Sequence, residues 1–165
     1  MIGSTGSGKT RFASALAQQL GVPHIELDAL FWQPGWVMTE ADELREKVAA
    51  AIACDGWVVD GNYGSRLGTA VLDQADQIVW LDLPLRTTFW RLLKRTVRRL
   101  HTRELLWGGN KETVCSAFLS RDSILLFALK TYRRGRRARA QLVADYPHVR
   151  LRSAHEVARY LEEVR

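Results

Sequence analysis

Apolar side chains follow two different periods along this chain, and the two periods predict alternating helices and strands. Between residues 12 and 20 they recur every three or four positions, which is typical of one buried helix face, and Gly21 supplies a stop. Residues 22–28 then form a short predicted strand. The segments 57–60 and 77–83 are almost continuously apolar, which indicates strands buried on both faces.

Two capping signals place further helices. Thr39, with Asp42 three residues later, predicts the start of a helix that ends near residues 55–56. Ser153 with Glu156 forms the same kind of capping box and predicts a last helix that runs to residue 164.

Two long helices and a final strand complete the pattern, over residues 85–101, 122–143 and 148–151. Strands therefore alternate with helices, which predicts an α/β fold with a mainly parallel sheet flanked by helices. In such sheets ligands bind beyond the carboxyl ends of the strands.

Length and composition narrow the class of protein. The chain has 165 residues, of which 47% are hydrophobic, so we expect one domain over residues 1–165 with one sizeable core. Its two cysteines are too few for a disulfide framework and lack the spacing of a zinc site. The sequence shows neither a signal peptide nor an apolar run long enough to span a bilayer, so we expect a cytoplasmic protein without a membrane partner.

Charge is unevenly distributed. Residues 86–139 carry 15 basic and 3 acidic side chains, a local charge of +12 within a chain whose formal net charge is +6. Such a segment attracts nucleic acid, anionic lipid or a phosphate-bearing small ligand, or it is only a solvated helix face. Charge alone leaves these alternatives open.

The segment Gly3-Ser4-Thr5-Gly6-Ser7-Gly8-Lys9-Thr10 matches the complete phosphate-binding loop GxxxxGK[ST]. Glycines permit its tight path, and successive N–H groups then point at phosphate oxygens beside a helix N-terminus. We expect Lys9 to contact the β and γ phosphates of ATP and the hydroxyl of Thr10 to bind Mg²⁺. The candidate ATP-binding residues are Gly3, Ser4, Thr5, Gly6, Ser7, Gly8, Lys9, Thr10 and the adjoining Arg11.

Two aspartates follow predicted strands and are expected on the same rim as this loop. Asp28 and Asp60 each close an apolar segment. Asp60 is the candidate second ligand of Mg²⁺ beside Thr10. The alternative for both aspartates is a role in a helix cap or a turn.

The motifs that define other classes of phosphate-loop protein are absent from this sequence. A GTPase needs Asn-Lys-x-Asp, whereas the corresponding string at residues 110–113 ends in Thr113, and the switch pattern fails because Tyr63 stands where glycine is required. Gly61 after Asp60 breaks the Asp-Glu pair usual in motor ATPases and helicases. Of these classes of phosphate-loop protein, the small kinases remain.

Several segments resemble the adenylate-kinase-like superfamily of small kinases over nearly the whole chain. Residues 56–61 look like the Gly-Phe-Ile-Leu-Asp-Gly strand of adenylate kinase, and residues 79–84 look like its next strand. Residues 27–36 together with 59–63 are similar to bacterial topology modulation proteins. The resemblance implies a phosphate-loop fold with about five parallel strands in the order 2-3-1-4-5. It also implies an acceptor-side helical segment at 29–56 and a basic lid over about 86–143.

The same resemblance suggests roles for three arginines and Asp28. Arg91 and Arg95 lie four residues apart on one helix face and are similar to the lid-hinge arginines that contact the transferred phosphoryl group. Arg121 weakly resembles the second arginine group of such lids. Asp28 resembles the aspartate that receives the acceptor hydroxyl proton in shikimate-kinase-type enzymes. The predicted catalytic residues are Lys9, Asp28, Arg91, Arg95 and Arg121.

Departures from adenylate kinase bear on the acceptor. Its arginine after the Asp-Gly strand occurs two positions later here, as Arg66, and residues 29–39 contain no arginine. A hydroxyl acceptor is therefore favoured over a phosphorylated one. Phe31, Trp32 and Trp36 either stack on a base or sugar of that acceptor or close the core below the second helix.

Three functions are compatible with these observations. The leading hypothesis is an ATP- and Mg²⁺-dependent phosphotransferase acting on a small hydroxyl-bearing or nucleotide-like acceptor. The alternative is a nucleic-acid-associated ATPase or regulator that binds phosphate backbone through its basic segment, and a third interpretation is a catalytically weak nucleotide-binding partner protein. Only Met1 and Ile2 precede Gly3, so we expect a first strand that is truncated, with Met1 inside the strand of a longer native chain.

Overall fold

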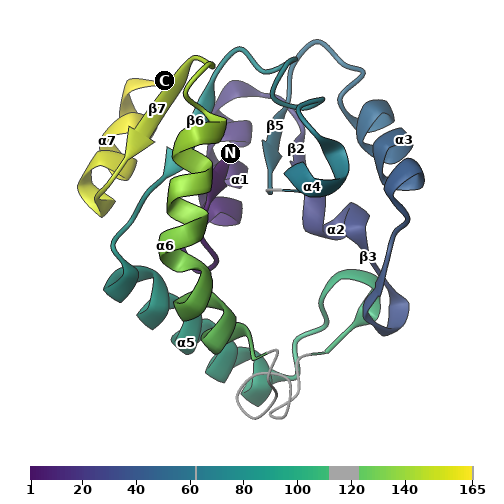
Figure 1. Ribbon diagram of the computed structural model, residues 1–165, viewed down its shortest axis with the longest axis vertical. Coiled ribbons are helices and arrows are strands. Elements are labelled where there is room, and N and C mark those ends of the chain that lie inside the picture. The colour runs from purple at the N-terminus through teal and green to yellow at the C-terminus, as the bar shows by residue number, and fades with distance from the viewer. Residues whose placement is uncertain (62, 112–122, 165) are drawn as a thin grey trace.

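The computed structural model describes residues 1–61, 63–111 and 123–164 and alternates strands with helices throughout (Figure 1). The strands are β1 (Ile2–Gly3), β2 (His24–Glu26), β3 (Trp32–Gln33), β4 (Val37–Met38), β5 (Val58–Asp60), β6 (Ile78–Leu81) and β7 (His148–Leu151). The helices are α1 (Lys9–Leu20), α2 (Leu27–Phe31), η1 (Pro34–Trp36), α3 (Ala41–Ala51), α4 (Gly64–Leu67), α5 (Leu85–Thr102), η2 (Trp107–Gly109), α6 (Ile124–Leu142) and α7 (Ala154–Glu163).

Parallel strands form the centre of the molecule, as the alternating pattern predicted. Strands β1, β6 and β7 pair in the order β1-β6-β7, and β2 pairs with β5 in a second parallel sheet. The carboxyl ends of β2 and β5 are in register, with Glu26 opposite Asp60. The α/β class with parallel strands flanked by helices is therefore confirmed.

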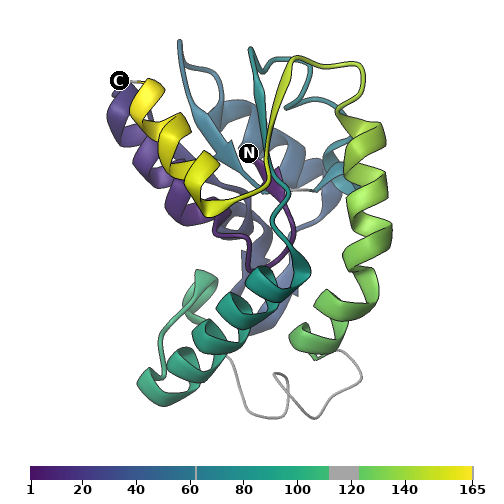
Figure 2. The same cartoon turned by 90° about the vertical axis from the view of Figure 1, so that its left-hand side faces the viewer.

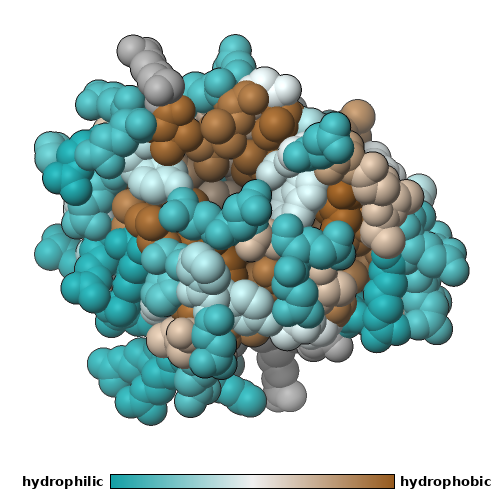
Figure 3. Space-filling model, turned by 90° about the horizontal axis from the view of Figure 1, so that it is seen from above, coloured by the Kyte–Doolittle hydropathy of each residue, from teal (hydrophilic) through white to brown (hydrophobic). Residues whose placement is uncertain are grey.

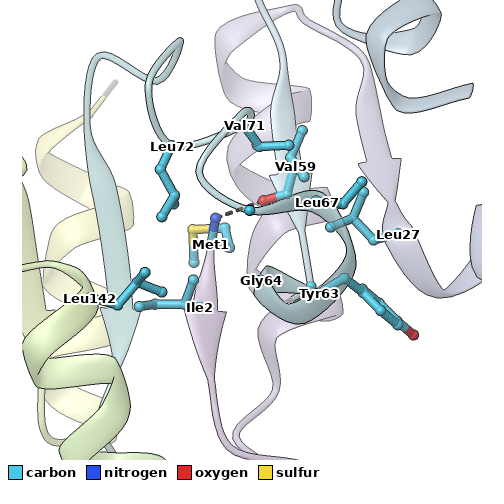
Figure 4. Close-up of a pocket in the computed structure, with 12 residues that line it drawn as sticks. Met1, Ile2, Leu27, Val59, Tyr63, Gly64, Leu67, Val71, Leu72 and Leu142 are labelled. Carbon is cyan, nitrogen blue, oxygen red and sulfur yellow. Dashed lines mark hydrogen bonds between the residues drawn. The ribbon is translucent and has the colours of Figure 1, made fainter. Parts of the chain in front are cut away.

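The single five-stranded sheet expected from the resemblance is replaced by these two sheets. Strand β1 contains only Ile2 and Gly3, and both residues pair with β6 and not with β5. Instead, the Met1 nitrogen donates a hydrogen bond to the Val59 carbonyl over 2.6 Å, and the Gly61 amide donates to the Met1 carbonyl over 3.3 Å (Figure 4). Two isolated bonds thus join the sheets where a continuous ladder was predicted.

A cavity of about 660 Å³ lies between β5 and β6 beyond Met1. Apolar side chains are exposed at this end of the molecule, between polar rims (Figure 3). The residues that line the cavity include Leu16, Ile52, Trp57, Leu72 and Tyr160. This opening is separate from the phosphate loop, which follows the opposite end of β1.

Helices cover both faces of the parallel strands (Figure 2). Val58, Val79 and Leu81 pack against α1 and α7 on one face. The residues next to them in sequence point the other way, because side chains alternate along a strand. Val59 accordingly packs against α2, α3 and α4, whereas Trp80 packs beside the end of α6.

Local differences from the sequence prediction have physical causes. The strand predicted over 22–28 ends at Glu26, because Leu27 begins α2. The capping box at Thr39 is wrong: the Thr39 side chain is buried and its hydroxyl donates to the Leu30 carbonyl, so α3 starts after Glu40. The capping box of α7 is confirmed, since Ser153 Oγ accepts from the Glu156 amide.

An antiparallel pair of short strands, β3 and β4, was not predicted. It lies within the predicted acceptor-side segment and forms a hairpin around η1, where Trp36 adopts a positive φ of 60°. No helix in the described part of the chain is both long and apolar enough to cross a bilayer.

Candidate active site

The phosphate loop connects β1 to α1 and is held by its own backbone. The Ser7 amide donates to the Ser4 carbonyl over 3.1 Å, and Gly8, with φ 91°, forms the N-cap of α1. The Lys9 ammonium donates to the same Ser4 carbonyl over 3.3 Å. This closed turn presents the N-terminus of a 12-residue helix, where backbone N–H groups and the helix dipole favour an anion.

Close packing against α5 explains why glycine is required at the centre of the loop. Gly6 has φ 80°, and a Cβ there would lie 2.3 Å from the Thr88 carbonyl oxygen of α5. Neither a side chain nor an ordinary backbone conformation fits. The first turn of α5 therefore supports the loop from below.

One cavity of about 490 Å³ connects the phosphate loop to the acceptor side. Its walls come from five parts of the chain: the loop, α2 with β3, the segment after β5, the start of α5, and α6. The lining residues that bear on the chemistry are Lys9, Asp28, Phe31, Trp32, Tyr63, Phe89, Phe127, Tyr132, Gly135 and Arg139. Lys9 and Asp28, both predicted from the sequence, are thus brought to the same cavity.

The electrostatic surroundings of Lys9 identify the groups nearest the phosphate position. Burial lowers the pKa of its ammonium, and the carboxylates of Asp60 and Asp28 partly oppose that shift. The guanidinium groups of Arg139 and Arg95 lower the pKa further. Two carboxylates and two guanidiniums are therefore near enough to shift the pKa of the lysine that is predicted to contact the phosphates.

Asp60 and Thr10 are the two residues that the sequence predicts as Mg²⁺ ligands. Asp60 is the last residue of β5 and is only 2% exposed. Its Oδ2 accepts no hydrogen bond from the described residues and lies 3.5 Å from Nε2 of His24. The Thr10 hydroxyl donates to Glu26 Oε1 over 3.4 Å.

A buried carboxylate oxygen with no hydrogen bond is the kind of ligand that Mg²⁺ takes, and this ion needs few protein oxygens when it also binds a nucleotide. The donor set therefore fits the ion. Glu26, opposite Asp60 in the strand register, was missed by the sequence interpretation, which assigned the end of this strand to Asp28. The alternation of residues along β2 could have identified Glu26, but the sequence interpretation placed the end of this strand two residues too late, at Asp28.

Asp28 lies in the first turn of α2, not at the end of a strand as predicted. Its Oδ1 accepts a hydrogen bond from the Tyr63 hydroxyl. Burial, reinforced by the charge of Asp28, raises the pKa of Tyr63 well above its usual value. The phenol therefore stays protonated and orients the carboxylate toward the cavity.

Aromatic rings form the wall beyond Asp28. The Phe31 ring packs against Tyr63 at 4.5 Å between centroids and against Trp32 at 4.7 Å. Phe31 is 5% exposed and belongs to the core below α3, yet it also lines the cavity. The predicted core role is thus confirmed for Phe31, and stacking on the acceptor stays a prediction for Phe31 and Trp32. Trp36 contacts the edge of Trp32 and does not line the cavity.

The predicted arginines occupy different positions. Arg91 donates from Nη1 to the Ser7 carbonyl over 3.1 Å and so supports the phosphate loop, whereas Arg95 is near enough to Lys9 to shift its pKa. Arg11 is exposed in the first turn of α1. Arg121 lies outside the described residues. The phosphoryl contacts assigned to Arg91, Arg95 and Arg121 remain predictions.

Arg139 was missed. The arginines of the second basic helix cover nearly all of its sides, and the sequence indicated a surface or polyanion-binding feature. Two of them face inward: Arg139 lines the cavity, and Arg136 binds Asp82. Tyr132, Gly135 and Arg139 recur at helical spacing on the cavity side of α6, which is the signal that could have separated Arg139 from the exposed arginines.

Asp82 holds the C-terminal half of α6 against the sheet. It follows β6 and is buried, with Arg136 Nε at 2.8 Å from Oδ1 and Arg150 Nε at 2.9 Å from Oδ2. Burial raises the pKa of this carboxyl, but the hydrogen bonds from Arg136 and Arg150 outweigh that and hold the pKa below its usual value. The Arg150 guanidinium also stacks 4.3 Å from the centre of the Trp80 ring.

Asn110 fastens η2, which follows the first basic helix in the chain, to the β3–β4 hairpin. Its amide group donates to the Gln33 carbonyl over 2.9 Å and to the Trp107 carbonyl over 2.7 Å, and its Oδ1 accepts from the Trp36 amide over 2.9 Å. A Cβ on Gly108 would lie 2.7 Å from the Gln33 carbonyl carbon, so the two segments are in close contact. The predicted lid and the acceptor-side segment are therefore joined next to the aromatic wall.

Comparison with solved structures places this architecture among known folds. The crystal structure of shikimate kinase from Bacteroides thetaiotaomicron is similar, with a TM-score of 0.56 and 15% sequence identity, over 99% of this chain and 93% of that one. The similarity shows that the chain has the fold of that small phosphate-loop kinase. No protein-family model and no curated protein sequence matches the chain.

Proposed function

We propose that this chain is an ATP-dependent phosphotransferase that transfers the γ-phosphoryl group to the hydroxyl of a small molecule. The observation that carries the proposal is that one cavity contains both the phosphate-loop lysine, Lys9, and a carboxylate set in an aromatic wall, Asp28. A protein that only bound ATP would not need a second, enclosed compartment beside the phosphates. The similarity to bacterial topology modulation proteins is compatible with this activity and stays a prediction.

The donor end binds and orients the triphosphate. The loop amides and the N-terminus of α1 donate hydrogen bonds to the β and γ phosphates, and Lys9 and Arg139, which line the same cavity, supply positive charge. Arg91 holds the loop through the Ser7 carbonyl. When bound, Mg²⁺ neutralises phosphate charge, and Thr10 and Asp60 are the residues that would hold it.

The acceptor end positions the hydroxyl and removes its proton. Asp28 accepts that proton as the acceptor oxygen forms its bond to the γ phosphorus and the bond from phosphorus to the β–γ bridging oxygen breaks, with ADP as the leaving group. Tyr63 keeps the carboxylate in place through its hydrogen bond. Positioning and charge stabilisation therefore account for the rate, since phosphoryl transfer needs little covalent chemistry from the protein.

Two substitutions test this assignment against matched controls. Lys9→Ala removes a charge needed in the transition state, so we expect the loss of nearly all turnover, whereas Lys47→Ala on the exposed side of α3 keeps it. Asp28→Asn should lower kcat by about 100-fold or more at unchanged ATP affinity, with exposed Asp55→Asn as control. Wild-type turnover in Lys9→Ala, or loss of ATP binding with normal turnover in Asp28→Asn, would contradict the assignment.

A second candidate function rests on the cations that α6 presents to solvent. Arg133, Arg134 and Arg137 are exposed, whereas Arg139 lines the cavity and the half-exposed guanidinium of Arg136 binds Asp82. This surface supports the hypothesis of a nucleic-acid-associated ATPase. If nucleic acid binds there, its affinity falls steeply with salt, because each neutralised phosphate releases counterions, and replacement of the three exposed arginines by Gln abolishes binding while acceptor phosphorylation persists.

A further inference from the structure

Helix α6 is anchored to the segment that follows β6 by two side chains one turn apart. The Arg136 guanidinium donates from Nε to Asp82 Oδ1 and from Nη2 to Oδ2, both over 2.8 Å, and the Tyr132 hydroxyl donates to the Leu83 carbonyl over 2.9 Å. A bidentate pair fixes the direction of the guanidinium as well as its distance. These contacts therefore set how α6 is rotated about its own axis.

The direction of Arg139 depends on that rotation. Arg139 lies three positions after Arg136, so the two side chains leave the helix about 60° apart. Arg136 points at Asp82, whereas Arg139 lines the cavity beside the phosphate loop. The Arg139 guanidinium lies next to Gly135, where a Cβ would be 3.1 Å from Nη1, and its Nε makes no hydrogen bond to a described residue. The helix that carries this guanidinium therefore positions it.

The charge of Asp82 acts on Arg139 as well. Burial lowers the pKa of the Arg139 guanidinium, and the Asp82 carboxylate opposes that shift, so the two groups are near enough to interact. The second partner of Asp82, Arg150, comes from β7 and donates to Oδ2 over 2.9 Å. Asp82, Arg136 and Arg150 do not line the cavity. Any effect of Asp82 on a ligand in this cavity is therefore indirect.

We propose that Asp82 is a positioning residue for phosphoryl transfer: through Arg136 it holds α6 at the rotation that keeps the Arg139 guanidinium in the cavity. This inference rests on the function proposed above. Asp82 and Arg136 are 54 residues apart in the chain, so the contact ties the end of β6 to a helix far away in sequence. A displacement of about 1 Å in a positioned group can cost about 100-fold in rate, so loss of this anchor affects turnover although Asp82 touches no ligand.

The two arginine partners of Asp82 supply a matched pair of variants. Arg136→Met and Arg150→Met each remove one guanidinium from the same carboxylate, but only the first releases α6. The Arg136 side chain is 46% exposed and that of Arg150 is 29% exposed, so the fold tolerates both changes. ADP release is measured with nucleosides and cyclic hydroxy acids as acceptors.

We expect Arg136→Met to lower kcat by about tenfold, with a smaller change in the KM for ATP, and Arg150→Met to keep kcat within about twofold of the wild type. Arg136→Lys keeps the charge but loses the bidentate geometry, so it should recover part of the rate.

The arginine side-chain signals in NMR spectra test the same point without turnover. In protein labelled with ¹⁵N at arginine, the Nε–H signal of Arg139 is identified by its absence from Arg139→Lys. We expect this signal to shift in Arg136→Met and in Asp82→Asn and to stay in place in Arg150→Met. A purely structural role of Asp82 would give the two methionine variants equal effects.

The outcomes separate the two proposals. Equal losses of kcat in Arg136→Met and Arg150→Met, or an unchanged Arg139 signal in Arg136→Met, refute the positioning role. A further loss of kcat when Arg136→Met is added to Arg139→Ala refutes it too, because the effect would then bypass Arg139. If the wild type phosphorylates none of the acceptors while it still binds ATP, the proposed function fails, and the NMR comparison still decides whether Asp82 positions Arg139.

Discussion

Gly135 occupies the middle of α6, where glycine is unfavourable, and its replacement by alanine should separate stability from activity. Alanine is preferred over glycine in a helix interior by about 1 kcal/mol. The new Cβ would lie 3.1 Å from Nη1 of Arg139, so this guanidinium must move by a few tenths of an ångström. We therefore expect Gly135→Ala to be more stable and less active than the wild type.

The two effects have different sizes. A gain of about 1 kcal/mol raises Tm by roughly 3 °C in a domain of this length. A charge-assisted hydrogen bond contributes about 1.5–3 kcal/mol, so halving the proposed contact between Arg139 and the transferred phosphoryl group costs about 0.75–1.5 kcal/mol, or roughly three- to twelvefold in kcat. Thermal unfolding and steady-state kinetics with a turned-over acceptor measure both.

A double-mutant cycle with Arg139→Ala isolates the cause. In the Arg139→Ala background, Gly135→Ala should still raise Tm but should no longer affect kcat. Full activity in Gly135→Ala, or a further loss of kcat in the double variant, would refute the argument that the absence of a side chain at Gly135 leaves space for the Arg139 guanidinium.

Three further outcomes follow from other contacts. Asp82→Asn leaves two guanidiniums without their buried carboxylate and should lower the free energy of unfolding by about 3 kcal/mol at pH 7, as denaturant melts will show. Because the folded-state pKa of Asp82 is below its usual value of 3.8, the stability it supplies is present above that pH and is lost as pH falls through the folded pKa, so the difference between wild type and Asp82→Asn should shrink in acid. Asn110→Ala removes three hydrogen bonds and should cost about 2 kcal/mol of stability while raising the acceptor KM more than the KM for ATP; the reverse order would show that the hairpin does not shape the acceptor site. Tyr63→Phe should lower kcat by about tenfold without loss of ATP affinity, since only the orientation of Asp28 is released, and an unchanged kcat would remove Tyr63 from the site.

The parts of this site that are contiguous in sequence were predictable, because their chemistry is local. A glycine-rich loop between a strand and a helix needs no distant residue to define it, and Lys9 and Thr10 follow from that motif. Asp60 was predictable because a continuous apolar strand precedes it. These residues lie where the sequence interpretation placed them.

The rest depends on contacts between distant segments. Arg139 reaches the cavity because Gly135 and the packing of α6 turn it inward, and local sequence does not distinguish it from the exposed Arg137. The sequence predicted Asp28 as the last residue of the strand, but in the structure that residue is Glu26. The difference arises because the buried Leu27, which is 3% exposed, begins a helix earlier than apolar alternation implies. The division into two sheets likewise depends on distant contacts, since both residues of β1 pair with β6.

The bridge at Asn110 bears on how such an enzyme avoids wasting its donor. Water competes with any alcohol for an activated phosphoryl group, and it is far more abundant. Asn110 joins chain segments that are 77 residues apart and so ties the basic helix to the hairpin beside the aromatic wall. Under the proposed function, this contact fixes one side of the compartment beside the γ phosphate and so favours an alcohol over water as the acceptor.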